Sequence, residues 1–301
     1  MDDPAVNEPT RRSGPMLVVL DVVGRTMIAT GAMMLMFVAY QLWGTGLAES
    51  RSQDDLGARF ESIVSTPPAS SVPTTVPAHG DVVSRIEIPS IGVDKFVVAG
   101  VDAKSLQKGP GLFPGSPLAG QLGNVAITGH RTTYGAPFSR IDELGPGDEV
   151  IVQTPSGEFT YIVDAEPFVV EPSRVEVART TDPNSAVLTL ISCHPRWTSE
   201  KRIVVTAVLE SDVEPAEPTV VVTDDAAEVP AALSEGWFHD PSAWPAVAGL
   251  FALLVAAYVG TIIVVRRGVR AFVAYPVMVV ALSPVIFVFF GQLSRLLPTN
   301  L

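Results

Sequence analysis

The stretch Ala186–Leu209, AVLTLISCHPRWTSEKRIVVTAVL, contains two β-type runs and the only cysteine of the chain. Branched apolar residues fill both runs, which is typical of buried strands. Cys193 ends the first run and Arg202 begins the second. Antiparallel pairing of the two strands would return both residues to the same end of a sheet. The stretch therefore predicts a thiol and a permanent cation side by side.

A second stretch, Asn124–Phe138, reads NVAITGHRTTYGAPF and also runs from a strand into a loop. Its branched run stops before Gly129, so His130 lies just beyond the end of a strand. A rigid strand fixes such a residue, while the loop leaves room for a ligand. A single cysteine with a histidine elsewhere in the chain is a candidate nucleophile with its proton carrier. From these residues alone, the alternative that Cys193 is a small buried apolar residue stays open.

The two stretches resemble the sortases, the cysteine transpeptidases that attach proteins to Gram-positive cell walls. The family's nucleophile motif is T-L-x-T-C followed by an arginine, and this chain has TLISC at Thr189–Cys193 and then Arg202. Thr128–Phe138, TGHRTTYGAPF, resembles the histidine segment of the class E sortases of actinobacteria. The resemblance covers roughly residues 81–210 and implies a mainly β fold, the eight-stranded sortase barrel.

The resemblance also implies roles for individual residues. Cys193 would be the nucleophile, His130 the acid that protonates the leaving amine, and Arg202 the donor to the developing oxyanion. The residues that we expect to contact the substrate are Tyr134, Thr189 and Ser192. The long loop Pro167–Ser185 lies where sortases shape recognition of the sorting signal.

This thiol–imidazole chemistry requires no metal or cofactor. With reference pKa values of about 8.5 and 6.5, only about 1% of such pairs are ionised at neutral pH, and that fraction suffices for a strong nucleophile. Cys193, His194 and His130 lack the CxxC or HxxxH spacing of a metal site. We therefore expect no metal, no cofactor and a structural role for His194.

Residues 81–210 consist of short β-type runs separated by Gly and Pro turns. The predicted strands are Val82–Ile88, Lys95–Val98, Asn124–Thr128, Glu149–Thr154, Glu158–Ala165, Ala186–Ile191 and Arg202–Leu209. So many short strands indicate a closed barrel or a sandwich, and composition does not choose between them. A domain of about 130 residues can bury an adequate core without disulfides.

The chain is 47% hydrophobic, and its mean hydropathy of +0.34 is high for a soluble protein. The excess is concentrated in three predicted transmembrane helices, residues 26–43, 244–265 and 271–293. Arginines before the first span and at 266–270 predict a cytoplasmic N-terminus (1–25), a cytoplasmic turn and an extracellular C-terminus (294–301). A cleaved signal peptide is the alternative for the first span, and either interpretation exports the β-rich region, residues 81–210. Class E sortases usually have one N-terminal anchor, so the C-terminal pair of spans departs from that class.

Two segments are predicted as linkers. Residues 44–80 end in a stretch rich in Ser, Thr and Pro, a composition that resists packing. Residues 211–243 carry acidic side chains but no Lys or Arg, and they contribute much of the net charge of −12. This distribution of charge argues against a nucleic-acid partner.

We expect a multi-pass protein of the cell membrane whose catalytic domain, residues 81–210, lies outside the cell. The resemblance implies that it cleaves an LPxTG-like or LAxTG-like sorting signal of a secreted protein after Thr, through a thioester on Cys193. An amino group of the peptidoglycan precursor lipid II would then accept the protein, with hydrolysis as a side activity. Two alternatives are a pilin-polymerising sortase that uses a pilin lysine as acceptor, and a non-catalytic membrane-tethered β domain that binds the wall. A simple thiol protease would be indifferent to added amines.

Overall fold

The structure is a computed structural model that describes residues 15–65, 77–210, 214–218 and 241–296. Two compact units, Met1–Tyr40 and Gln41–Leu301, divide the chain. The first unit contains helix α1 (Pro15–Ala39), which is apolar along most of its length. Parts of the predicted N-terminal tail and of both predicted linkers, and the end of the predicted C-terminal segment, lie outside the described residues.

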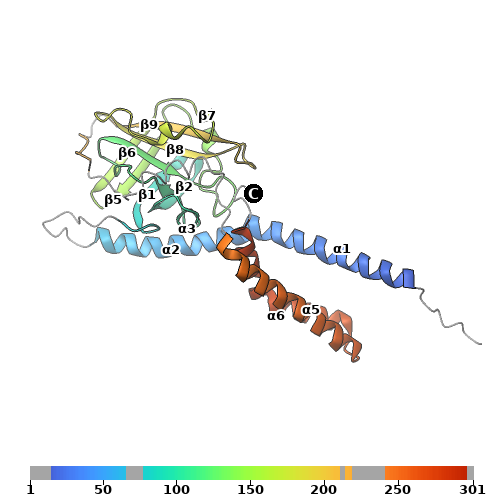
Figure 1. The fold of residues 1–301 in the computed structure, drawn as a ribbon. Helices are drawn as coiled ribbons and strands as arrows, with labels where there is room; N and C mark the ends of the chain where they lie inside the picture. Colours follow the sequence, from blue (N-terminus) through green and yellow to red (C-terminus); the bar gives the residue numbers. More distant parts are fainter. Residues whose placement is uncertain (1–14, 66–76, 211–213, 219–240, 297–301) are drawn as a thin grey trace, which may run out of the picture. The chain divides into compact units, whose positions relative to one another are not determined.

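The strands of the second unit form a closed β-barrel (Figure 1). The described strands are β1 (Val82–Ile88), β2 (Val93–Ala99), β3 (Gly111–Leu112), β4 (Gly123–Thr128), β5 (Glu149–Thr154), β6 (Gly157–Val163), β7 (Phe168–Val170), β8 (Ala186–His194) and β9 (Lys201–Leu209). Pairing follows the order β6-β5-β1-β2-β3-β4-β8-β9, and β9 pairs with β6 again. These eight strands close the barrel, so the predicted eight-stranded fold is confirmed and the sandwich alternative is wrong.

One edge of β9 is shared between two strands. Its last residues, Ala207–Leu209, pair with β6, and its first, Arg202–Val204, pair with β7. Strands β6 and β7 therefore lie along the same edge of β9, and the pairing with β6 closes the barrel. The sequence prediction missed β3 and β7 because two or three residues are too short to show an alternating pattern.

The barrel interior is filled by inward-facing residues that alternate along each strand. Ile86, Ile127 and Leu188 are among the fully buried members of this core. In β8 the even-numbered residues point inward, whereas Ile191 belongs to a second apolar cluster on the outer face. Because side chains alternate, Cys193 shares the outer face with Ile191.

Helix α2 (Thr45–Val64) occupies residues that we predicted as the first part of a linker. Leu56 and Phe60 are only 3% and 4% exposed, and they pack against Val82 and Val98 of the barrel. The linker prediction is therefore wrong for residues 45–64. The pattern was missed because only two large apolar residues mark the buried face of this helix.

Polar contacts also attach α2 to the barrel. The Gln53 carboxamide accepts from the Phe96 amide at 2.7 Å, and donates to the carbonyls of Phe96 at 3.0 Å and Lys108 at 2.8 Å. Glu49 is 1% exposed and pairs with Lys95 at 2.7 Å. The helix is thus part of the folded domain.

Three helical segments, Thr26–Val64, Trp244–Arg266 and Ala271–Ser294, contain an apolar stretch long enough to cross a membrane. Residues 45–64 of the first segment are α2, which packs on the barrel. The last two segments are helices α5 and α6, which pair with each other through the rings of Phe251 and Phe289 and of Tyr258 and Tyr275. The remaining short helical elements are a π-helical turn (Tyr40–Gly44), α3 (Ala103–Leu106), and 3-10 turns at Pro89–Ile91, Ile141–Glu143, Val175–Ala178 and Pro241–Ala243.

Candidate active site

Cys193 and Arg202 are direct partners in the antiparallel register of β8 and β9. The predicted pairing of these two strands is therefore confirmed. The cysteine is half-buried, whereas Arg202 is 1% exposed. Its Nη1 donates to the carbonyls of Ser199 at 2.8 Å and Lys201 at 3.0 Å, which fixes the guanidinium beneath the loop between the strands.

Strands β4 and β9 flank β8 on opposite sides, and His130 follows the end of β4. Strands β4 and β8 run parallel, with Thr128 opposite Ile191. Continuing this register by two residues brings His130 level with Cys193, and neighbouring strands lie about 4.8 Å apart. The sheet order thus places the loop that carries His130 on one side of β8 and Arg202 on the other.

Three hydrogen bonds hold the histidine loop against the cysteine strand. The Thr128 hydroxyl and the Gly129 amide donate to the carbonyl of Ile191, at 3.0 and 3.2 Å. The Ser192 hydroxyl donates to the Gly129 carbonyl at 2.8 Å. These bonds lie immediately before His130 and Cys193, so they fix the separation of the two main chains.

The loop after His130 has an unusual backbone. Tyr134, Gly135 and Ala136 all have positive φ, at 49°, 73° and 43°. Two of them are not glycine, so the loop is strained and must be supported from outside. Helix α2 supplies that support, because the Tyr134 amide donates to the Thr45 hydroxyl at 3.2 Å, and a Cβ at Gly135 would come within 2.4 Å of a Glu49 carboxylate oxygen.

Burial sets the protonation of the site. His130 is 5% exposed, and this burial lowers its pKa from 6.5 to about 4. Burial raises the pKa of Cys193, while the charges of Arg202 and Arg131 oppose that rise. Burial also lowers the pKa of Arg202, whereas the charge of the Cys193 thiolate raises it. At neutral pH the site therefore holds a thiol and a neutral imidazole.

The three residues predicted to contact substrate have different surroundings. Tyr134 is 6% exposed, and its ring lies 5.1 Å from that of His130. The Thr189 hydroxyl donates to the Asn124 carboxamide at 2.8 Å, on the outer face of β8. Ser192 is 1% exposed, and its hydroxyl is already engaged by Gly129. Their contact with a substrate stays a prediction.

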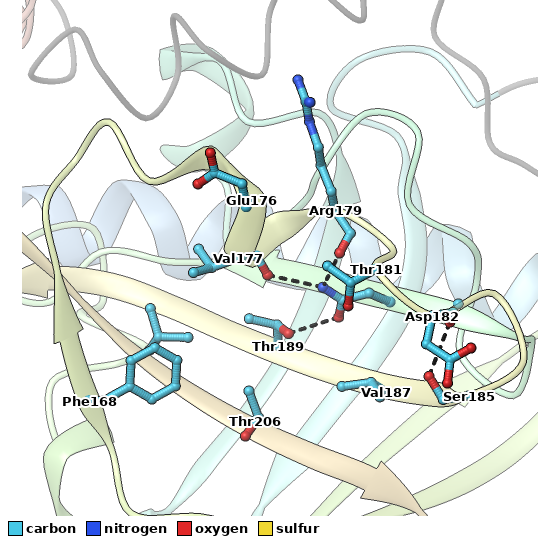
Figure 2. Close-up of a pocket in the computed structure, with 13 residues that line it drawn as sticks. Phe168, Glu176, Val177, Arg179, Thr181, Asp182, Ser185, Val187, Thr189 and Thr206 are labelled. Atoms are coloured by element: carbon cyan, nitrogen blue, oxygen red, sulfur yellow. Dashed lines mark hydrogen bonds between the residues drawn. The ribbon is translucent and has the colours of Figure 1, made fainter.

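A pocket of about 200 Å³ lies on the outer face of the barrel, at the start of β8 (Figure 2). Phe168 and Thr206 lie at one side of it, and Asp182 and Ser185 at the other. The Asn124 carboxamide donates to two carbonyls of the loop before β8, at 3.0 and 3.2 Å. Seven of the thirteen lining residues belong to the predicted recognition loop, namely Phe168, Glu176, Val177, Arg179, Thr181, Asp182 and Ser185.

The sequence prediction gave no role to Arg131, which follows the histidine directly. It is 4% exposed, and its Nη1 donates to the Cys193 carbonyl at 3.1 Å. The signal was present in the quoted TGHR segment, where a charged residue follows a strand end. Among the described residues, no cluster of three or more His, Cys, Asp or Glu side chains is placed to hold a metal ion.

The family model described as "Sortase domain" matches residues 86–210. Sortase SrtE1 of Streptomyces coelicolor is 32% identical over 217 residues, which are 65% of this chain and 58% of that protein. Sortase SrtE2 of the same organism is 26% identical over 202 residues, 62% of this chain and 80% of that protein. The chain thus spans less than two thirds of the length of SrtE1.

Among solved structures, sortase E from Streptomyces avermitilis is 35% identical, with a TM-score of 0.40, and the match covers 46% of this chain and 93% of that one. The family match ends at residue 210, one residue past β9, and it contains the cysteine, histidine and arginine described above. Residues 86–210 therefore form a sortase domain, and the chain resembles the class E sortases of Streptomyces.

Proposed function

We propose that this protein is a membrane-anchored cysteine transpeptidase in which Cys193, His130 and Arg202 carry the reaction. The substrate would be a secreted protein with an LPxTG-like or LAxTG-like sorting signal. The Cys193 sulfur attacks the Thr carbonyl, the bond to Gly breaks, and a thioester forms. An amine, we propose that of lipid II, then attacks the thioester and releases the thiol.

The protonation of the resting site indicates how protons move. Because His130 is neutral and Cys193 is a thiol at neutral pH, the imidazole can accept the thiol proton as the sulfur attacks. The imidazolium then gives that proton to the departing Gly amine. Arg202 stays protonated throughout, and it suits the negative charge that develops on the carbonyl oxygen.

The pocket at the start of β8 supports an extended substrate. Thr189 lines the pocket and lies four residues before Cys193 on the same face of the strand. Four residues of extended chain span about 13 Å. The first residue of a sorting signal lies three residues, about 10 Å, before its Thr. A signal whose Thr is at the sulfur would therefore extend toward the pocket and the loop that carries Glu176 and Arg179.

The three candidate spans support attachment to the cell membrane. We propose that the N-terminus is cytoplasmic and that the barrel lies outside the cell. There it would meet exported substrates and the amino groups of the growing wall.

The strand register that brings Cys193 opposite Arg202 and level with His130 carries this proposal. To test it, full-length protein in detergent micelles is given fluorogenic LPxTG and LAxTG peptides, with and without an added amine nucleophile. We expect cleavage between Thr and Gly, and mass spectrometry should show the amine adduct. Cys193→Ala should lose about a thousandfold or more of the activity, and Arg202→Gln about a hundredfold.

Arg140→Gln is the matched control, because Arg140 is half-exposed and pairs with Glu143 on the surface. It removes the same charge and should leave cleavage unchanged. Cleavage that persists in Cys193→Ala would exclude the proposal. Products that contain water but never amine would indicate a hydrolase, and exclusive use of a pilin lysine would indicate a polymerase.

A further inference from the structure

Arg131 is a buried cation that the proposed mechanism does not use. Only 4% of it is exposed, although it carries a permanent charge. Its Nη2 lies 2.8 Å from the Asp142 carboxylate, in the 3-10 turn Ile141–Glu143. A buried charge is expensive unless it is paired, and this ion pair compensates the guanidinium.

The other arm of the same guanidinium reaches the cysteine strand. Nη1 donates to the Cys193 carbonyl at 3.1 Å and lies 3.2 Å from Nδ1 of His194. A guanidinium offers several donors in a rigid planar fork, so one side chain can hold a carboxylate and a carbonyl at once. Arg131 thereby connects the loop that carries His130 to the end of β8.

Two cations lie near the sulfur, from different parts of the barrel. Arg202 belongs to β9, and Arg131 to the loop that follows β4. Their charges oppose the rise in the Cys193 pKa that burial causes, Arg202 more strongly than Arg131. Other ionisable groups near this end of β8 include His130 and His194, Lys201 with its partner Glu171, and Arg196, which acts on Asp142.

We propose that Arg131 is a positioning residue, which fixes the main chain at Cys193 and helps Arg202 to stabilise the thiolate. Asp142 holds the guanidinium in place for this task. The inference rests on the proposed function, in which Cys193 is the nucleophile. A neutral side chain at position 131 would leave the thiol harder to ionise and the strand end less well fixed.

The test measures the ionisation of Cys193 without any substrate. Because the chain has one cysteine, the rate of alkylation by iodoacetamide reports on this thiol alone. Full-length Arg131→Gln, Arg131→Lys and Asp142→Asn proteins in detergent are compared with wild type from neutral to alkaline pH. Arg140→Gln, in the same loop, is the matched control for the loss of one charge.

We expect Arg131→Gln to shift the pH midpoint of alkylation upward and to lower kcat/KM about ten- to hundredfold, the loss typical of one charge-assisted hydrogen bond. Arg131→Lys should keep the midpoint close to wild type but not recover full turnover. Asp142→Asn should lie between wild type and Arg131→Gln. Arg140→Gln should match wild type in both measurements.

An unchanged midpoint in a folded Arg131→Gln protein would overturn the inference. If that variant does not fold, Arg131→Lys and Asp142→Asn provide the test. Wild-type rates of alkylation and turnover in both of these variants would also overturn the inference. A wild-type protein whose thiol titrates as described but which cleaves no peptide would refute the proposed function and leave the role of Arg131 on the thiol intact.

Discussion

At the scale of single residues, burial of His130 opposes the protonation of its ring. The ring is 5% exposed, and its pKa is lowered from 6.5 to about 4. In the proposed mechanism this supplies a neutral base at physiological pH, and the folded protein does not easily take up a proton there. The unfolded chain can, so protonation favours unfolding as the pH falls.

This asymmetry predicts a pH dependence of stability. Between pH 6.5 and about pH 4 the unfolded state binds more protons than the folded state, so the free energy of unfolding should fall as the pH is lowered through this window. Once the pH has fallen through this window, protonation at His130 should have lowered the free energy of unfolding by about 3 kcal/mol. Denaturant unfolding of full-length protein, followed by tryptophan fluorescence, should show a shallower acid dependence in His130→Gln. An equal dependence in both proteins would contradict the prediction.

A residue pair on two recognisable neighbouring strands could be predicted, and a pair that depends on how a loop folds could not. A short connection between two β-type runs was enough to place Cys193 opposite Arg202. The pairing of Arg131 with Asp142 depends instead on how the loop after β4 folds back on itself. Nothing in the spacing of these two residues indicates that the loop does so.

At the scale of elements, α2 is where sequence and structure differ most. Its barrel-facing residues are Thr45, Glu49, Gln53, Leu56 and Phe60, all buried and spaced by three or four positions. That spacing is helical, but the first three residues are polar and conceal the pattern. Their polarity is explained only by partners on the barrel, such as the main chain of Phe96 for Gln53.

The helix should therefore contribute measurably to the stability of the barrel. Phe60→Ala removes a ring that is 4% exposed and packs against Val82 and Val98, and we expect a loss of about 3–5 kcal/mol. Ile63→Ala, on the same helix but at a residue that is 45% exposed, should change stability by about 0.5 kcal/mol or less. Denaturant unfolding of both full-length variants checks this. Equal stability of the two variants would show that α2 is not part of the cooperative domain.

At the scale of the full chain, charge and hydropathy together determine the expected topology. Helices α5 and α6 form an apolar pair, and the turn between them carries Arg266, Arg267 and Arg270. Basic residues in short loops next to transmembrane spans are typical of the cytoplasmic side. With a third span near the N-terminus, this orientation would put the barrel outside the cell.

Thiol labelling in intact cells tests this topology directly, because Cys193 is the only cysteine. A small charged methanethiosulfonate that does not cross membranes should label Cys193 from outside, since the residue is half-buried and not sealed. In a Cys193→Ala background, Val269→Cys places a new thiol in the basic turn, where Val269 is 44% exposed. That thiol should react only after the membrane has been permeabilised. If Val269→Cys reacted in intact cells, the turn would lie outside, and the arginines would not orient this helical pair.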